Sequence, residues 1–127
     1  MYGEKLSLEL LASRHECSVI KPPVVTGRSG VVHRFDFLAR DGEEYLGFDV
    51  YDRLDEISVI KTFIKRTDTG ASVAIICPKV HVPEALQGLL REYNMKVVSP
   101  DKIEPAFPVR KSPYAVLRGQ KPGATGS

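Results

Sequence analysis

The fold is decided by residues 31–51, which read VVHRFDFLARDGEEYLGFDVY. Residues 31–40 predict one extended strand and residues 44–51 a second, because the side chains of each fall into two alternating sets. Between them stands Asp41-Gly42, a strong signal for a two-residue turn. The stretch therefore predicts an antiparallel hairpin.

Two acids occupy this hairpin. Asp36 lies on the first strand and shares a face with Leu38. Phe35 is expected on the opposite face, together with His33 and Phe37. Asp49 lies on the second strand, so both carboxylates can approach one end of the sheet. Two carboxylates there can ligate a hard divalent cation such as Mg²⁺ through oxygen. Such a metal activates water and neutralises charge at a scissile phosphate.

A structural role is the alternative for both acids. Asp49 can pair with a lysine or arginine at the strand end, and Asp36 can form a salt bridge to Arg34 or Arg28. Each acid, however, stands between apolar neighbours on a core hairpin, where an unpaired carboxylate is costly. That placement favours a functional role.

Helix and strand patterns continue on both sides of the hairpin. The expected elements are a helix at 4–14, an extended edge segment at 18–25, a polar loop at 26–30, a helix at 55–66, a buried strand at 72–78, a helix at 83–93 and a strand at 96–99. In the second helix, Ile57, Ile60 and Ile64, together with Val59 and Phe63, form the expected apolar stripe. A hairpin followed by two helix–strand units predicts an α/β fold, a mixed sheet flanked by helices.

Size and composition fit one ordinary globular domain. The chain has 127 residues, of which 43% are hydrophobic and 27% charged. No apolar run approaches the length of a membrane span, and the N-terminus carries no signal-peptide pattern, so a cytoplasmic location is expected. Cys17 and Cys77 are not in a CxxC pair, which predicts buried free thiols rather than a zinc site.

Charge separates a body from a tail. The net charge is +2, yet residues 1–104 carry an excess of two acids, whereas residues 105–127 hold four basic residues and no acid. Those four are Arg110, Lys111, Arg118 and Lys121. We expect an α/β domain at 1–104 and an irregular, Pro/Gly-rich tail at 105–127. The tail either solvates the chain end or lies along phosphates of a nucleic acid.

Three stretches carry a family resemblance. They are residues 27–39 (GRSGVVHRFDFLA), residues 47–50 (GFDV) and residues 67–71 (TDTGA) leading into the strand 73–77. They resemble archaeal RecB-like and Mrr-like predicted endonucleases of the PD-(D/E)xK superfamily. The resemblance spans about residues 4–100 and implies a restriction-endonuclease-like fold.

The resemblance also implies a metal site. Asp36 and Asp49 would be the strand acids, and the helix acid would be Glu9 or Glu16. The family lysine should stand two residues after Asp49, but Tyr51 is there instead. A tyrosine with a pKa near 10 is a poor group for orienting or activating the attacking water.

A lysine from the following helix is one replacement for the missing group. Lys61 and Lys65 are the candidates, with solvated helix-face residues as the alternative interpretation. His33 is expected either to bind a phosphate or to be a satisfied structural residue. Around Arg28, the loop at 26–30 is expected to offer backbone N–H groups and a guanidinium to phosphate, or to be a plain connection.

Three functions remain open at this stage. The first is a nucleic-acid-binding protein of nuclease-like fold with weak or lost catalysis, in which Arg28, His33 and Arg34 contact nucleic acid together with the basic tail. The second is an active Mg²⁺-dependent endonuclease that uses Asp36 and Asp49. The third is an accessory protein of a ribosome or another ribonucleoprotein, anchored by its tail. An ammonium group close to the two carboxylates would favour catalysis, and lysines directed to solvent would favour binding alone.

Overall fold

The computed structural model describes residues 2–107, with side chains from residue 8 on. The helices are α1 (Tyr2–Arg14), α2 (Glu56–Thr69) and α3 (Gln87–Glu92), with short 3₁₀ turns at Lys79–His81, Glu84–Leu86 and Glu104–Ala106. The strands are β1 (Ser18–Val19), β2 (Val24–Thr26), β3 (Val32–Arg34), β4 (Phe37–Asp41), β5 (Glu44–Val50), β6 (Ser72–Ile76) and β7 (Lys96–Val98). The expected tail contacts of Arg110, Lys111, Arg118 and Lys121 lie outside the described residues.

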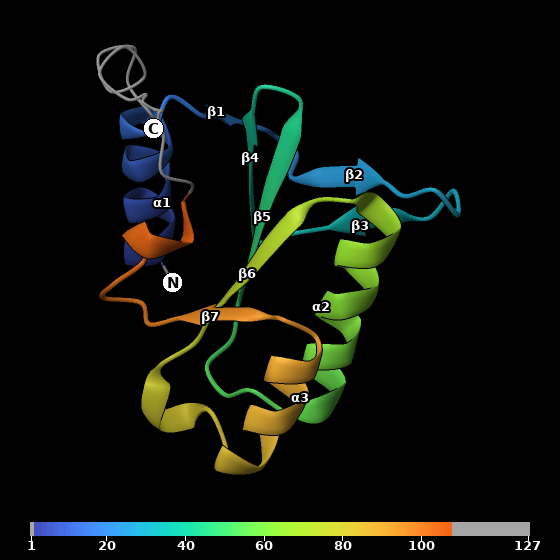
Figure 1. Cartoon of the computed structure of the whole chain (residues 1–127). Helices are drawn as coiled ribbons and strands as arrows, with labels where there is room; N and C mark the ends of the chain where they lie inside the picture. The colour runs from blue at the N-terminus through green and yellow to red at the C-terminus, as the bar shows by residue number, and fades with distance from the viewer. Residues whose placement is uncertain (1, 108–127) are drawn as a thin grey trace, which may run out of the picture.

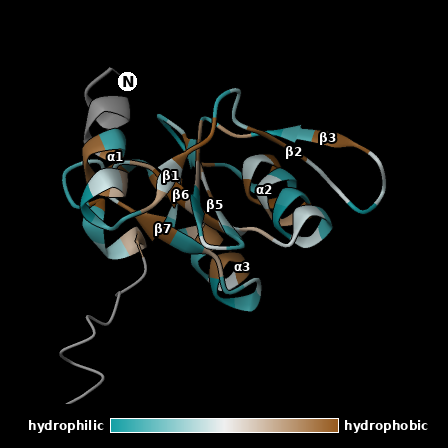
Figure 2. Cartoon of the chain, turned by 90° about the horizontal axis from the view of Figure 1, so that it is seen from above, coloured by the Kyte–Doolittle hydropathy of each residue, from teal (hydrophilic) through white to brown (hydrophobic). Residues whose placement is uncertain are grey.

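A five-stranded mixed sheet forms the centre of the molecule (Figure 1). Its strand order is β1-β4-β5-β6-β7, in which β4 is antiparallel to β1 and β5, whereas β6 and β7 run parallel to β5. Figure 2 shows α1 on one side of this sheet and α2 on the other. The α/β architecture predicted from the sequence, a hairpin followed by two helix–strand units, is therefore confirmed.

The first hairpin strand is interrupted, contrary to the sequence-based expectation. The chain bends at Phe35 and Asp36, so that β3 pairs with β2 in a separate two-stranded sheet while β4 joins the main sheet. The Phe35 ring lies over Gly47, where an added Cβ would be only 2.6 Å from it. Phe35 consequently packs beside Leu38 rather than on the face of Phe37. The bend leaves Asp36 exposed at the start of β4.

The β4–β5 turn is also shifted by one residue. Asp41 pairs with Glu44, so Gly42 and Glu43 form the turn, and Gly42 adopts the positive φ of 65° that such tight turns favour. This register continues through Phe37 and Phe48. It places the next pair of residues along the ladder, the two aspartates, opposite each other.

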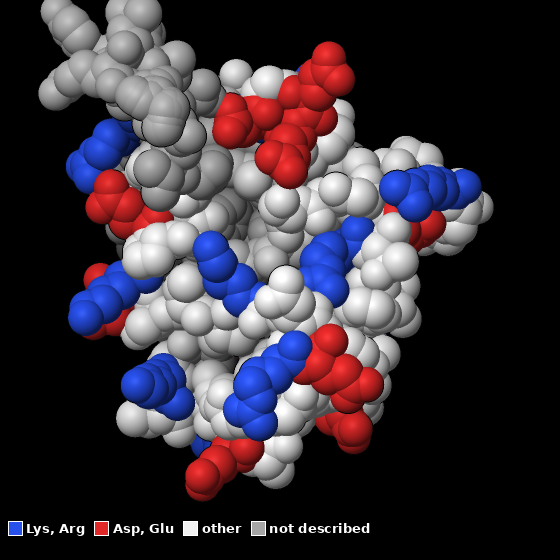
Figure 3. All heavy atoms as spheres, in the orientation of Figure 1, with Lys and Arg blue, Asp and Glu red and all other residues white. Residues whose placement is uncertain are grey.

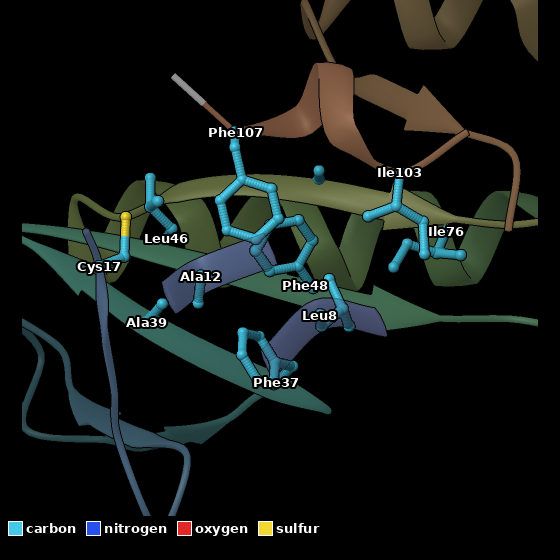
Figure 4. Packing of buried hydrophobic residues seen from close by; sticks show 11 residues of the cluster. Leu8, Ala12, Cys17, Phe37, Ala39, Leu46, Phe48, Ile76, Ile103 and Phe107 are labelled. Carbon is cyan, nitrogen blue, oxygen red and sulfur yellow. The ribbon is translucent and has the colours of Figure 1, made fainter. Parts of the chain in front are cut away.

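One core cluster lies between α1 and the sheet (Figure 4). Leu8 and Ala12 of α1 pack against Phe37 and Phe48, and Phe107 closes the cluster with its ring centroid 5.2 Å from that of Phe48. Phe107 is only 4% exposed. The packed domain therefore reaches Phe107 and does not end at residue 104, because an aromatic side chain beyond the expected boundary completes this core.

Helix α2 turns only part of the predicted apolar stripe toward the sheet, because Val59 and Phe63 pack inward whereas two of the isoleucines do not. Asp55 caps its N-terminus by accepting a hydrogen bond from Ser58 N–H, and Gly70 ends it in a left-handed conformation. The buried residues of α2 are Val59 and Thr62, whereas Ile57 and Ile64 of the expected stripe are 66% and 51% exposed. The helix is rotated so that a partly polar face, which includes Thr62, is turned inward.

Smaller expectations are settled by the same architecture. The helix expected at residues 83–93 divides into a 3₁₀ turn and α3, and the extended segment at 18–25 divides into β1 and β2. Cys17 and Cys77 are buried free thiols, as predicted. Among the described helices, none is both long enough and apolar enough to cross a bilayer.

Candidate active site

Asp36 and Asp49 face each other across the β4–β5 pair. The backbone N–H of Asp36 donates to Asp49 Oδ1 at 3.3 Å, and the backbone N–H of Val50 donates to Asp36 Oδ2 at 2.7 Å. Each carboxylate thus binds the backbone of the other's strand. The two acids predicted to share one end of the hairpin are brought together by this exchange.

The two carboxylates have contrasting surroundings. Asp49 is 3% exposed, on the side of the sheet that α2 covers, whereas Asp36 is exposed at the bend. Burial raises the pKa of Asp49, an effect that its contact with Lys65 opposes in part. A buried carboxylate with a raised pKa beside an exposed one is a pattern found at reactive centres.

Lys65 of α2 supplies an ammonium group to this pair. Its Nζ lies 2.5 Å from Asp49 Oδ2, donates to the Arg34 carbonyl oxygen at 2.7 Å, and stands 4.6 Å from the centroid of the Phe35 ring. These contacts fix the ammonium from three directions. Apart from the ion pair with Lys65, Asp49 Oδ2 has no hydrogen-bond partner within residues 8–107.

The second lysine candidate does not join the site. Lys61 lies one helical turn earlier, is exposed, and acts electrostatically on Asp55 at the N-terminus of α2. Of the two candidate lysines, Lys65 therefore lies at the aspartates, and the position of Lys61 matches the alternative of a solvated helix-face residue.

Tyr51 occupies the position of the family lysine but takes part in packing. Its hydroxyl lies 3.2 Å from Thr62 Oγ1, and its ring contacts the cluster between α2 and the sheet. Burial raises the pKa of the Tyr51 hydroxyl above its usual value of 10.0. Tyr51 is thus held as a neutral phenol, and Lys65 provides the charge that tyrosine lacks.

Glu9 does not complete a three-acid site. Its Oε2 forms an ion pair with Lys21 Nζ at 3.3 Å, and it lines a cleft that also reaches Asp36. Throughout the described part of the chain there is no group of three His, Cys, Asp or Glu side chains that could hold a metal ion. The expected joint ligation by Glu9, Asp36 and Asp49 is absent there, because Glu9 projects from α1 on the opposite side of the sheet from α2. The other helix acid considered, Glu16, follows α1 in a left-handed conformation with φ 61°.

His33 has a structural partner. Its Nε2 lies 2.7 Å from Asp68 Oδ2, and the same carboxylate accepts hydrogen bonds from the backbone N–H and the hydroxyl of Ser29. These hydrogen bonds lower the pKa of Asp68 to about 2, with the Ser29 hydroxyl as the largest cause. The cluster fastens the β2–β3 ribbon to the C-terminal end of α2, so the phosphate-binding role expected for His33 is not supported.

The loop around Arg28 is likewise closed on itself. The backbone N–H groups of residues 27–31 donate to the Val31, Asp68 and Gly27 carbonyl oxygens, the Asp68 carboxylate and the Ser29 hydroxyl. Within the loop expected to meet a phosphate, the N–H groups of residues 27–30 are therefore used internally. The expected offer of backbone N–H groups to a phosphate is therefore wrong, and the loop is a plain connection. Arg28 and Arg34 are nevertheless exposed.

Sequence reasoning missed two participants in this region. Thr62 is buried beside Tyr51, and Lys21 lines the cleft next to Asp36. The signal for Thr62 was its place three residues after Val59, a member of the predicted apolar stripe, and one turn before Lys65. Lys21 had no local signal, since only the antiparallel pairing of β1 with β4 and of β2 with β3 brings it near Asp36.

Comparison with known proteins supports the fold and nothing finer. No protein-family model and no curated protein matches the chain. Among solved structures, the chain is similar to a crystal structure of the protein of unknown function AF1548, with a TM-score of 0.58 and 13% sequence identity. The similarity covers 94% of this chain and 65% of that one, so the chain spans slightly less than two thirds of the AF1548 chain.

Proposed function

We propose that the protein is a divalent-metal-dependent nuclease that hydrolyses phosphodiester bonds at the Asp36–Asp49 pair. The observation that carries the proposal is the position of Lys65, whose ammonium lies 2.5 Å from Asp49 Oδ2 although the family position holds Tyr51. Two carboxylates on adjacent strands, with the Lys65 ammonium beside them, supply the charges of the PD-(D/E)xK pattern that the sequence resembles. The lysine comes from α2 instead of β5.

The donor set suits a hard cation. The carboxylates of Asp36 and Asp49 would hold Mg²⁺ through oxygen, and Asp49 Oδ2 is a buried acceptor with only an ion-pair partner. When bound, the metal polarises the phosphodiester and lowers the pKa of a water molecule. Asp36, being exposed, would hold the metal at the surface of the protein, where a phosphate is accessible.

Lys65 has a defined role in this scheme. Its ammonium is held by Asp49, by the Arg34 carbonyl oxygen and over the Phe35 ring. A positive charge fixed in this way stabilises the negative charge that grows on the phosphoryl oxygens in the transition state. It also positions the attacking water, because one of the three N–H donors of the ammonium is left after Asp49 and the Arg34 carbonyl oxygen.

Binding without cleavage is the second candidate. It is favoured by the absence of a third ligand in residues 8–107 and by the hydrogen bonds that both carboxylates already accept. In this case Lys65 and Asp49 form a purely structural ion pair. An accessory role in a ribonucleoprotein rests on the basic tail alone and stays a prediction.

Cleavage assays with paired lysine variants distinguish these candidates. End-labelled single-stranded and duplex DNA and RNA are incubated with Mg²⁺ or Mn²⁺ and with Asp36→Asn, Lys65→Met and Lys61→Met proteins. We expect the wild type to cut at least one substrate, and Asp36→Asn and Lys65→Met to lose about 10²–10⁴-fold in kcat/KM. Lys61→Met, the matched change one turn away on α2, retains wild-type activity.

Two results would overturn the proposal. One is the lack of any metal-dependent cleavage by the folded wild-type protein. The other is cleavage that Asp36→Asn and Lys65→Met leave unchanged, which would indicate a contaminating nuclease. A circular dichroism spectrum of each variant confirms that it is folded.

A further inference from the structure

A cleft opens directly beside Asp36, on the edge of the molecule where β1 leads into the β2–β3 ribbon. It has a volume of about 400 Å³, and its lining includes Asp36, Arg34, Lys21 and Glu9. Ligand pockets for small molecules are about 300–1,000 Å³, so the cleft suits one compact group and not a double helix.

The cleft is lined by half-buried apolar residues and by exposed charged residues. Ile20 and Pro23 are half-buried apolar residues of the wall, whereas Arg34 and Lys21 are exposed cations. An apolar wall beside cations complements a nucleotide, whose base and sugar offer flat apolar surfaces and whose phosphate is an anion. Asp36 belongs both to this lining and to the proposed reaction site, so the cleft adjoins that site.

The charge of the surrounding surface argues against duplex binding. Residues 1–104 have two more acids than basic residues, and Figure 3 shows basic and acidic side chains interspersed over the face drawn there. An acidic group gathers at the β4–β5 turn, where Asp41, Glu43 and Glu44 lie. Duplex recognition relies on many phosphate contacts over a wide basic surface.

From these observations we propose that the cleft receives one unpaired nucleotide next to the scissile phosphate, so that the substrate is single-stranded or locally unpaired nucleic acid. This inference rests on the proposed nuclease function and names its substrate class. A base inside a duplex is stacked and paired, and it must leave the helix before it can enter a cleft of this size.

Glu9 regulates the same cleft by competing for Lys21. The Glu9–Lys21 pair is 3.3 Å long, and the two side chains are 44% and 72% exposed. Such exposed pairs are weak, about 0–1 kcal/mol, so an incoming phosphate can displace the carboxylate. Glu9 thereby lowers the affinity for nucleic acid instead of ligating metal.

Binding in the absence of metal tests the cleft independently of catalysis. Fluorescence anisotropy in EDTA compares a labelled mixed-sequence 12-nucleotide single strand with the same sequence as a duplex. We expect the single strand to bind at least 10-fold more tightly. The double variant Lys21→Gln, Arg34→Gln should reduce its salt slope by about 1.4, or 0.7 per lost phosphate contact. Lys79→Gln, an exposed lysine in the 3₁₀ turn after β6, is the matched control and keeps the wild-type slope.

Glu9→Gln separates the two roles considered for Glu9. A released Lys21 should tighten single-strand binding several-fold in EDTA and leave the Mg²⁺ concentration for half-maximal cleavage unchanged. Unchanged binding together with a raised Mg²⁺ requirement would instead identify Glu9 as a metal ligand and overturn its competing role.

The remaining outcomes keep the two proposals apart. Equal or tighter binding of the duplex overturns the cleft proposal, even if the protein cleaves nucleic acid. Single-strand preference that depends on Lys21 and Arg34, without cleavage of any substrate, supports the cleft and overturns the nuclease.

Discussion

Helix α2 takes part in two aspartate clusters that resemble each other only in outline. Asp68 lies at its C-terminal end and accepts hydrogen bonds from Ser29, with His33 Nε2 also 2.7 Å from its carboxylate. Asp49 lies on β5 beside Lys65, near the middle of the helix. Each cluster joins α2 to a strand or loop distant in sequence, so position alone does not tell which one is functional.

The direction of the pKa shift separates the two clusters. Hydrogen bonds lower the pKa of Asp68 to about 2, as expected for a carboxylate whose partners stabilise its charge. Burial raises the pKa of Asp49, whose Oδ2 has only an ion-pair partner among the described residues. A carboxylate whose pKa is lowered in the fold stabilises it when ionised, whereas one whose pKa burial raises is retained at a cost in stability and is a candidate for chemistry.

Substituting each aspartate in turn tests most directly which of the two clusters is functional. We expect Asp49→Asn to lower kcat/KM at least about 10²-fold, because the charge that holds Lys65 and would bind metal is lost. Asp68→Asn should keep activity within a few-fold of the wild type. Steady-state cleavage of one labelled oligonucleotide measures both values, and equal losses in the two variants would contradict the assignment.

Gly47 and Gly27 each pack closely against one of the two aspartate clusters, Gly47 on the side of Asp49 and Gly27 on the side of Asp68. A Cβ at Gly47 would lie 2.6 Å from the Phe35 ring, over which the Lys65 ammonium lies. A Cβ at Gly27 would lie 2.0 Å from Asp68 Oδ2. Gly47→Ala should therefore reduce both stability, by roughly 1–3 kcal/mol, and cleavage. Gly27→Ala should reduce stability alone.

Urea unfolding and cleavage assays measure these effects, with Gly88→Ala as the control. Gly88 lies in α3 with no atom within 4 Å of an added Cβ, so alanine there should stabilise the protein by about 0.5–1 kcal/mol. Full activity in Gly47→Ala would show that the Phe35 support is dispensable for the site.

The pH dependence of stability should have opposite signs at the two aspartates. The pKa of Asp68 is lower in the folded state than its ordinary 3.8, so its stabilising contribution is complete above that value and is lost as the pH falls toward 2. The pKa of Asp49 is raised, so ionising this group disfavours the folded state as the pH rises above its ordinary value.

Thermal unfolding between pH 2 and pH 7 tests this sign. Asp68→Asn should have a lower Tm than the wild type at pH 7 and a shallower decline below pH 4. Asp49→Asn should have an equal or higher Tm at pH 7. A large drop in the Tm of Asp49→Asn would indicate that the ion pair with Lys65 is a stabilising element instead.

The smallest effect is expected on the outer face of α2. Ile57 is 66% exposed, so Ile57→Ala should change the free energy of unfolding by no more than about 0.5 kcal/mol. Val59, two residues away, is fully buried, and Val59→Ala should cost roughly 2 kcal/mol. Urea denaturation of the two variants checks the orientation of α2 that brings Lys65 to Asp49, and the reverse order of the two losses would contradict that orientation.

Local patterns were sufficient for the hairpin and for the pairing of its acids. Glycine in the turn and the two-residue period of strands limit where Asp36 and Asp49 can lie, although the turn is one residue later than the sequence indicated. The same patterns failed at Phe35, where the chain leaves its strand. The empty space above Gly47 accepts the phenyl ring, and such a fit between distant residues has no local signature.

The sequence by itself determined the order of helices and strands, the mixed sheet, and two aspartates on neighbouring strands, because hydrophobic periodicity and turn chemistry act over a few residues. The tertiary structure alone decided which lysine joins them. Lys61 and Lys65 lie one turn apart on the same helix, and their local signals are equal. The burial of Val59 and Thr62 fixes the rotation of α2, and with it the choice of Lys65.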